Sequence, residues 1–112
     1  VVKSMLICLD EKDFVLVVLE ATRKVSFSKL RALMQIKNVR LATAEEVHNV
    51  TGYPVGGVPP ISIYGTPTLI DTHVQDHAWV VCGGGDSNSL LKIQSADIIE
   101  WAYEPQVADV AE

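Results

Sequence analysis

Residues 1–20 read VVKSMLICLDEKDFVLVVLE, and this stretch decides the fold of the chain. Two runs rich in β-branched and apolar residues, Val1 to Leu9 and Asp13 to Glu20, flank the polar tripeptide Asp10-Glu11-Lys12. Apolar runs of this length on either side of a short polar segment are typical of a β-hairpin. We therefore predict that a β-sheet is the frame of the protein.

Helices and further strands are predicted after this hairpin. A helix capped by Ser26 or Ser28 runs to about Gln35, and a capping box at residues 43–46 opens a second helix that Gly52 ends. The other predicted elements are short: strands over 39–41, 68–70 and 79–82, a helix over 96–102 capped by Ser95, and a closing strand over 107–110. The pattern predicts one α+β domain over residues 1–112, with a mixed or antiparallel, barrel-like sheet flanked by short helices.

Composition and charge narrow the function classes. The chain has 112 residues, 48% of them hydrophobic, which is enough for one packed core. Nine Lys and Arg against fourteen Asp and Glu give a net charge of −5, so there is no basic field for long stretches of nucleic acid backbone. The charge therefore argues against a duplex binder, and we predict no DNA partner. A pocket that accepts only the end of an RNA remains compatible with this charge.

The cysteines and the hydropathy pattern indicate the compartment. Cys8 and Cys82 are far apart and outside any C-x-x-C pair, which favours a reducing environment over a disulfide framework. No run of about 18 apolar residues is present, and the N-terminal residues do not have the pattern of a signal peptide. We predict a cytoplasmic protein with no membrane partner.

Metal and nucleophile motifs are weak in this sequence. His73 and His77 are four residues apart, but the sequence lacks the Glu of H-E-x-x-H and a third ligand nearby. Neither cysteine and no serine stands in a recognisable catalytic motif. Asp71 and Asp76 have the pattern of loop carboxylates. We predict no metal and no cofactor, and we expect any hydrolase built on this chain to work mainly through positioning and backbone donors.

Lys3 is the most informative charged residue. In a strand it shares its face with Val1, Met5, Ile7 and Leu9, so its ammonium group sits in an otherwise apolar row. Desolvation of this group is costly unless a partner or a ligand anion compensates. Two interpretations follow: Lys3 binds a ligand, or it reaches solvent from the end of the strand.

Two glycine-rich segments, Gly56-Gly57 and Gly83-Gly84-Gly85, have two interpretations as well. They expose backbone N–H groups with no side chain in the way, as close approach of a ligand requires, or they are two tight turns. Neither segment matches a P-loop or a dinucleotide-binding fingerprint. A nucleoside triphosphate site is therefore not predicted.

Four segments together resemble the YbaK/ProX family of aminoacyl-tRNA deacylase domains. They are Val2-Lys3-Ser4-Met5-Leu6, then Thr51-Gly52-Tyr53-Pro54-Val55-Gly56-Gly57-Val58-Pro59-Pro60, then Gly83-Gly84-Gly85, then Val107-Ala108-Asp109-Val110. Their order and spacing are those of the family, and the block of ten residues is the most specific. Family members usually carry a helical segment and a strand before the Lys-Ser strand, so we expect that this N-terminal segment is missing here.

The resemblance implies a function and a site. It implies hydrolysis of the aminoacyl ester of misacylated tRNA, of the Cys-tRNA(Pro) or Ala-tRNA(Pro) type, with the aminoacylated tRNA 3′ end and prolyl-tRNA synthetase as partners. The implied catalytic residues are Lys3, which anchors the terminal phosphate or ester, and Gly56 and Gly57. The implied substrate-binding residues are Ser4, Tyr53, Val58, Pro59, Pro60, Gly83, Gly84, Gly85 and Ser87.

Two other functions remain open on the sequence alone. One is a non-catalytic module that binds aminoacyl-tRNA or a synthetase. The other is a pocket protein that uses Lys3 to hold a small anionic metabolite. Deacylation activity would separate the hydrolase from both.

Overall fold

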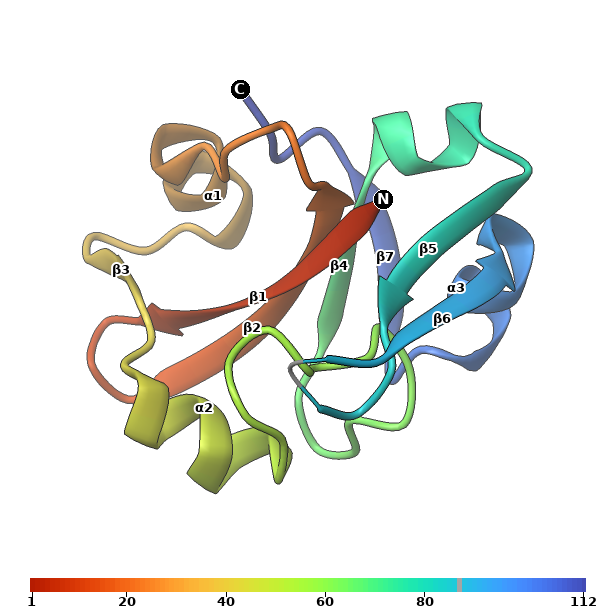
Figure 1. Cartoon of the computed structure of the whole chain (residues 1–112). Helices are drawn as coiled ribbons and strands as arrows, with labels where there is room; N and C mark the ends of the chain where they lie inside the picture. Colours follow the sequence, from red (N-terminus) through yellow and green to blue (C-terminus); the bar gives the residue numbers. More distant parts are fainter. Residues whose placement is uncertain (87) are drawn as a thin grey trace.

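The computed structural model describes residues 1–86 and 88–112. A five-stranded sheet with the order β3-β1-β2-β4-β7 forms the centre, and a separate two-stranded ribbon, β5-β6, lies beside it (Figure 1). The strands are β1 Val2–Leu9, β2 Asp13–Glu20, β3 Val39–Leu41, β4 Thr68–Asp71, β5 Trp79–Gly83, β6 Leu90–Gln94 and β7 Pro105–Ala108. The helices are α1 Phe27–Met34, α2 Ala44–Thr51, the 3₁₀ helix η1 Thr72–Asp76 and α3 Ser95–Trp101.

The predicted hairpin is confirmed. β1 and β2 pair antiparallel from Val2 opposite Glu20 to Leu9 opposite Asp13. Asp10 and Glu11 in the turn have positive φ values, and the Asp10 carboxylate accepts the N–H groups of Lys37 and Asn38, which fixes the turn against the segment before β3.

The mixed sheet is confirmed, but its predicted barrel-like closure is wrong. β1 pairs antiparallel with β2 and β3, whereas β2 pairs parallel with β4 and β4 pairs parallel with β7. Among the described residues the sheet is open, with β3 and β7 as its edges. The strands that could extend it, β5 and β6, pair with each other instead.

The first two helices begin and end as predicted. The Ser26 hydroxyl accepts the Lys29 N–H at the start of α1, and Thr43 and Glu46 form the capping box of α2, which ends at Gly52 in the left-handed conformation. Arg40 contacts Glu46 from β3, and hydrogen bonds from Arg40 and the Thr43 backbone lower the pKa of Glu46 to about 2. The Glu46 carboxylate is therefore held by hydrogen bonds from Arg40 and the Thr43 N–H at the N-terminus of α2.

Three predictions at the C-terminal end need correction. Ser95 is the first residue of α3 and not its cap, because its hydroxyl donates to the carbonyl of His77. The closing strand β7 begins two residues earlier than predicted. β6 and η1 were not predicted at all, since β6 has only one partner strand and most of its residues are exposed.

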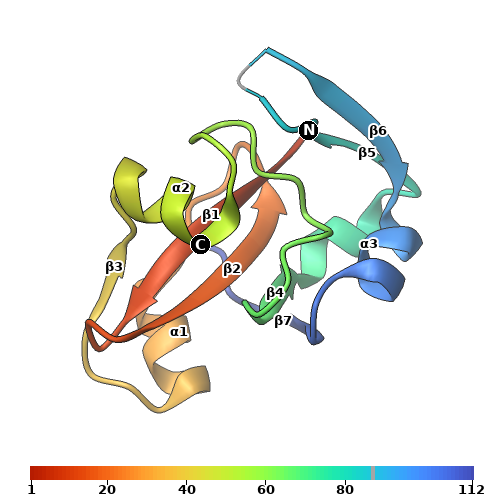
Figure 2. The same ribbon diagram turned by 90° about the horizontal axis from the view of Figure 1, so that it is seen from below.

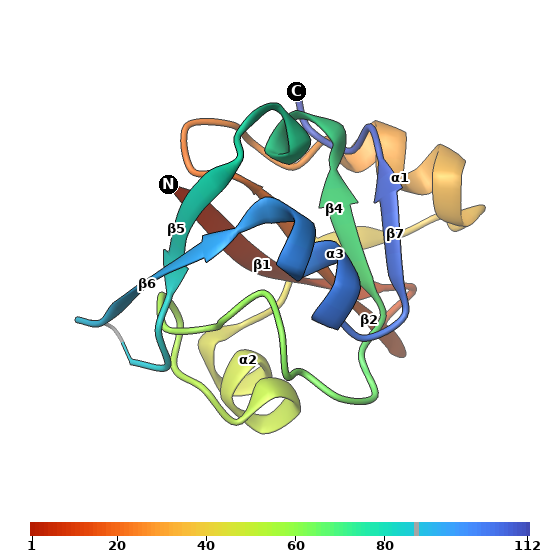
Figure 3. The same cartoon turned by 90° about the vertical axis from the view of Figure 1, so that its right-hand side faces the viewer.

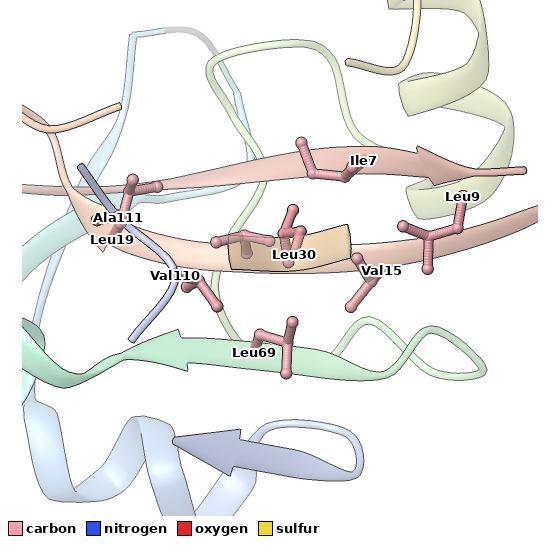
Figure 4. Close-up of a cluster of buried hydrophobic side chains, with 9 residues drawn as sticks. Ile7, Leu9, Val15, Leu19, Leu30, Leu69, Val110 and Ala111 are labelled. Atoms are coloured by element: carbon pink, nitrogen blue, oxygen red, sulfur yellow. The ribbon is translucent and has the colours of Figure 1, made fainter. Parts of the chain in front are cut away.

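The main core lies between α1 and the sheet. Ile7, Leu9, Val15, Leu19, Leu30, Leu69, Val110 and Ala111 meet there, together with Val17 (Figure 4). The other face of the sheet carries two more buried clusters, one around β5 and α3 and one around α2. No helix among the described residues is both long enough and apolar enough to cross a membrane.

Asp71 is a fully buried carboxylate, and its interpretation as a loop carboxylate is wrong. Its oxygens accept the Val110 N–H at 3.1 Å, the His73 N–H at 3.2 Å and the His73 ring nitrogen Nδ1 at 2.9 Å. Burial raises the pKa of Asp71, but these hydrogen bonds outweigh burial and the pKa is lowered. The carboxylate therefore ties the C-terminal segment to the start of η1.

The substitution Asp71→Asn is expected to destabilise the fold by about 2 kcal/mol at pH 7, because a buried charged acceptor loses its strongest hydrogen bonds. Because the pKa of Asp71 is lower in the folded state than in the unfolded state, its ionised carboxylate contributes stability at pH values above the unfolded-state pKa of about 4. This contribution is lost as the pH falls through the folded-state pKa. The difference between wild type and variant should therefore shrink below about pH 4. Urea unfolding at pH 7 and pH 3 measures this; an equal difference at both pH values would contradict it.

Candidate functional site

The candidate site lies along the part of β1 that β3 leaves uncovered. β3 pairs only with Ile7–Leu9 of β1, and the Ala42 N–H just after β3 donates to the Leu6 carbonyl, so residues 2–5 have a hydrogen-bonded strand on one side only. A cavity of about 470 Å³ occupies this edge. Figure 2 shows the loop that follows α2 between β1 and the β5–β6 ribbon, and residues from all these segments line the cavity.

The cleft, as this cavity is called below, collects five of the predicted site residues. They are Lys3, Ser4, Gly56, Val58 and Gly83. Its other lining residues are mainly apolar: Val1, Val2, Met5, Leu6, Ala21, Leu41, Ala42, Val47, Val55 and Leu90. The sequence therefore predicted the polar and glycine residues of the cleft, whereas most of its apolar lining residues were not predicted as site residues.

Lys3 is a half-buried cation at the cleft. Within the described residues its ammonium group has no ion pair, whereas Arg23, Lys29 and Arg40 each bind a carboxylate. It also lines a second cavity of about 540 Å³ on the α1 side of β1. Lys3 is thus free to bind an anion where the two cavities meet.

Ser4 lies between two of the buried clusters. Val2 and Leu6, which share its face of β1, belong to the cluster around β5 and α3 and to the cluster around α2, respectively. The Ser4 hydroxyl oxygen is buried and has no hydrogen-bond partner among the described residues. A buried hydroxyl without a partner costs stability, so its presence beside a cleft points to a use in ligand binding.

Gly56 and Gly57 have different places in one turn. The Gly57 N–H donates to the Pro54 carbonyl at 3.0 Å, and Gly56 has φ +85°, the arrangement of a type II turn that favours glycine at its third position. Gly56 lines the cleft, and its N–H has no backbone acceptor among the described residues. Gly57 is buried behind the turn, and its own N–H is already bonded.

The glycines allow two loops to touch. A Cβ on Gly57 would lie 2.7 Å from the Asp86 carbonyl carbon, and one on Gly83 would lie 2.7 Å from the Val58 carbonyl oxygen. The Gly85 N–H donates to the Gly57 carbonyl at 3.0 Å. Close contact between backbones, more than exposure of N–H groups, is therefore what most of these glycines provide.

The remaining predicted site residues line a second, shallower hollow, or they lie away from the cleft and from this hollow. Tyr53, Pro59, Gly84 and Gly85 line a hollow of about 290 Å³ that shares Gly83 with the cleft. Pro60 is buried and lines none of these cavities. Ser87 lies outside the described residues.

Among the described residues, Cys82, His73 and His77 do not provide a nucleophile or a metal site. Burial raises the pKa of the Cys82 thiol, which keeps it protonated and unreactive. His73 and His77 bind Asp71 and Glu20, respectively. In residues 1–86 and 88–112, no three His, Cys, Asp or Glu side chains are grouped as metal ligands.

Missed lining residues come from segments that are remote in sequence. Val47 from α2, Leu41 from β3 and Leu90 from β6 meet at the cleft only because the chain folds. The buried face of α2 gave a weak signal for Val47. Nothing in the sequence pattern distinguished Leu41 or Leu90 from other exposed apolar residues.

Comparison with known proteins places the chain in a family. A family model described as the aminoacyl-tRNA editing domain matches residues 1–101. The proline–tRNA ligase of Halalkalibacterium halodurans is 31% identical over 88 residues, which are 79% of this chain and 15% of the ligase. That of Lactobacillus delbrueckii subsp. bulgaricus is 33% identical over 90 residues, 80% of this chain and 16% of the ligase.

Two solved structures have the same fold. The hypothetical protein APE2540 has a TM-score of 0.87 at 32% identity, over 100% of this chain and 74% of that one. A candidate trans-editing enzyme for prolyl-tRNA synthetase has a TM-score of 0.89 at 28% identity, over 99% of this chain and 69% of that one.

The fold is that of a small editing-type domain. The chain belongs to the aminoacyl-tRNA editing domain family, which confirms the resemblance found in the sequence. It spans 15–16% of the length of the two proline–tRNA ligases named above.

Proposed function

We propose that this domain is an aminoacyl-tRNA deacylase that hydrolyses the ester between a wrongly attached amino acid and the 3′ end of a tRNA. The observation that carries the proposal is Lys3, a cation without an ion pair among the described residues, at the edge of a largely apolar cleft. An apolar pocket with one positioned cation fits a small side chain linked to an anionic RNA end. Membership in the family supports the same reaction class.

Backbone groups and water are sufficient for this reaction. An aminoacyl ester is already activated, so hydrolysis needs an attacking water and donors for the developing oxyanion. Gly56, whose N–H has no backbone acceptor among the described residues, lines the cleft, and residues 2–5 of β1 offer an uncovered strand edge there. Lys3 holds the phosphate or ester oxygen, and the N–H groups stabilise the oxyanion. Gly57 holds the turn in place, and its own N–H donates to the Pro54 carbonyl and not to the oxyanion.

The apolar part of the cleft receives the amino acid. Leu6, Val47 and Val58 come from β1, α2 and the turn loop and pack together in one cluster. These side chains favour a small apolar or thiol side chain over a charged one, because a charged group would lose its hydration there. Alanine and cysteine attached to tRNA(Pro) are the proposed substrates. Prolyl-tRNA synthetase is the proposed partner, because a stretch of the two proline–tRNA ligases named above is similar to this chain.

Release of labelled amino acid from tRNA(Pro) charged with cysteine, alanine or proline tests the proposal. We expect hydrolysis of the cysteine or alanine ester at a rate well above the uncatalysed one, with the proline ester spared. Absence of hydrolysis of all three by folded protein would overturn the deacylase assignment. Binding of the charged tRNA without hydrolysis would then favour a non-catalytic module.

The substitution Ser4→Ala separates a structural from a functional role of the Ser4 hydroxyl. Removing a buried hydroxyl that has no partner should leave stability unchanged or raise it by about 1 kcal/mol. If the hydroxyl serves the substrate, kcat/KM for deacylation should fall about tenfold in the same variant, the value of one neutral hydrogen bond. Thermal unfolding and deacylation rates are measured together. Unchanged kcat/KM would remove Ser4 from the site.

A further inference from the structure

We infer that the outer side of the β5–β6 ribbon and of α3 binds a protein partner whose matching surface is apolar at its centre and basic around it. This inference rests on the proposed partnership with prolyl-tRNA synthetase and names the surface through which the two proteins meet. We call this surface the ribbon face. Its residues are Trp79, Val81, Lys92, Glu100 and Trp101.

The ribbon has one buried side and one exposed side. Val80 and Cys82 of β5 belong to the buried cluster around β5 and α3. Side chains alternate along a strand, so Trp79 and Val81 lie on the opposite side. Strand pairing places Lys92 opposite Val81, and the Lys92 ammonium group lies 5.2 Å from the centroid of the Trp79 ring. These three residues therefore share the outer side of the ribbon.

Both tryptophans of the chain are exposed on the ribbon and α3. Trp79 is 53% exposed, and Trp101, the last residue of α3, is 65% exposed. Figure 3 faces the side of the molecule that carries β5, β6 and α3. Trp79 pairs with Gln94, directly before α3, and this helix of seven residues rises about 10 Å, so both tryptophans fit within one interface of ordinary size. Tryptophan is enriched among the residues that dominate binding between proteins.

The free edge of β6 favours a protein as the partner. Within the described residues β6 pairs with β5 alone, so its other edge has no neighbouring strand. All residues of β6 except Ile93 are exposed. An exposed strand edge can be extended by a strand of another protein, which supplies matching N–H and C=O groups. RNA has no such backbone.

The charges near the ribbon face favour a basic partner and disfavour RNA. Eight of the nine Lys and Arg are in residues 1–40, whereas residues 71–112 contain eight Asp and Glu and only one cation, Lys92. Some of these carboxylates lie in α3 or within a few residues of the ribbon or α3, and they have no ion pair within the described residues: Asp76, Asp97, Glu100 and Glu104. They repel phosphate groups and attract Lys and Arg of a partner.

A prolyl-tRNA synthetase has the chemistry that this surface requires. Proteins that bind nucleic acid carry basic surface patches, and a synthetase binds tRNA. Most cations of the present chain lie in or next to α1 and β3, on the opposite side of the molecule from the ribbon (Figure 1). Trp79 and Trp101 line neither the cleft nor the second cavity. A synthetase bound at the ribbon face would therefore leave the cleft open to its substrate.

Binding of prolyl-tRNA synthetase to the 112-residue protein labelled with 5-fluorotryptophan tests the inference. Both fluorine signals should shift on addition of the synthetase, because Trp79 and Trp101 are the only tryptophans. The affinity, measured by calorimetry, should fall about tenfold or more in Trp79→Ala and in Trp101→Ala. It should fall about threefold or more in Glu100→Lys. The matched control Tyr64→Ala removes an aromatic side chain that is 80% exposed outside the ribbon face, and it should keep the wild-type affinity.

Several results would overturn the ribbon face. They are absence of binding to the synthetase, full affinity in both tryptophan variants, and an equal loss of affinity in Tyr64→Ala. Self-association of the protein that the tryptophan variants abolish, measured by sedimentation, would assign the face to a second copy of the chain. Weaker binding of bare tRNA(Pro) by the tryptophan variants would assign it to RNA.

Deacylation of charged tRNA(Pro) by the domain alone, measured on the same samples, separates this inference from the proposed function. The tryptophan variants should deacylate at the wild-type rate, and circular dichroism checks that they are folded. Tryptophan-dependent binding of the synthetase without deacylation would keep the ribbon face and remove the hydrolase. Deacylation without such binding would do the reverse.

Discussion

The substitution Lys3→Ala is expected to lower kcat/KM for deacylation by about 100-fold or more while leaving the fold intact. Lys3 is the cation shared by the cleft and the second cavity on the α1 side of β1, and no carboxylate among the described residues binds it. Its loss removes the attraction for the anionic RNA end and breaks no ion pair described in the structure. Deacylation of charged tRNA(Pro) and thermal unfolding, measured on the same preparation, check both parts of the expectation.

Two control variants make this test specific. Lys12→Ala removes an exposed cation in the β1–β2 turn and should leave kcat/KM unchanged. Lys3→Arg keeps the charge but changes the geometry of the cation. The variant should therefore retain part of the substrate binding, and its kcat should fall by a larger factor than its KM rises. If Lys3→Ala deacylated at the wild-type rate, Lys3 would be a cation that merely reaches solvent from the strand.

The substitution Gly57→Ala is expected to have the second-largest effect, a loss of about 2–3 kcal/mol of stability together with most of the activity. The added Cβ would lie 2.7–2.9 Å from three backbone atoms of Asp86, and backbone cannot move aside as the end of a flexible side chain can. The turn at residues 54–57 would have to shift, and Gly56 at the cleft would shift with it. Displacement of positioned donors by a fraction of an ångström is enough to slow catalysis.

Gly65→Ala is the matched control for Gly57→Ala. Gly65 has φ +85°, but a Cβ there meets nothing within 4 Å, so the substitution tests backbone strain without a steric clash. It should cost about 1 kcal/mol and leave deacylation unchanged. Thermal melts and kcat/KM of both variants are compared. Equal melting temperatures and equal rates would show that the contact between the two loops is unimportant.

The glycine signature has a different physical meaning from the one first considered. The sequence indicated N–H groups exposed to a ligand or two tight turns. In the structure the turn interpretation holds for residues 54–57, and the glycine triplet packs against that turn. Of the five glycines, Gly56 and Gly83 line the cleft. Gly57 and Gly83 explain why the two loops can lie close enough to form one wall of the site.

Local signals in the sequence determined the hairpin, the first two helices and the family. The β-branched and apolar runs of β1 and β2, the serine cap and the capping box each involve residues close together in the chain, so each can be interpreted without knowledge of the fold. The same holds for the block at residues 51–60. Lys3 stood out because a cation in an apolar row is costly wherever that strand packs.

The tertiary structure alone decided the rest. The cleft exists because β3 covers only three residues of β1, and because β5 and β6 pair with each other beside an open sheet. Asp71 has the sequence pattern of a loop residue, yet it is buried, because Val110 returns from 39 positions along the chain to donate to it. Strand order, sheet edges and hydrogen bonds such as that from Val110 to Asp71 depend on contacts between segments that are remote in sequence. A local sequence pattern does not indicate how favourable those contacts are.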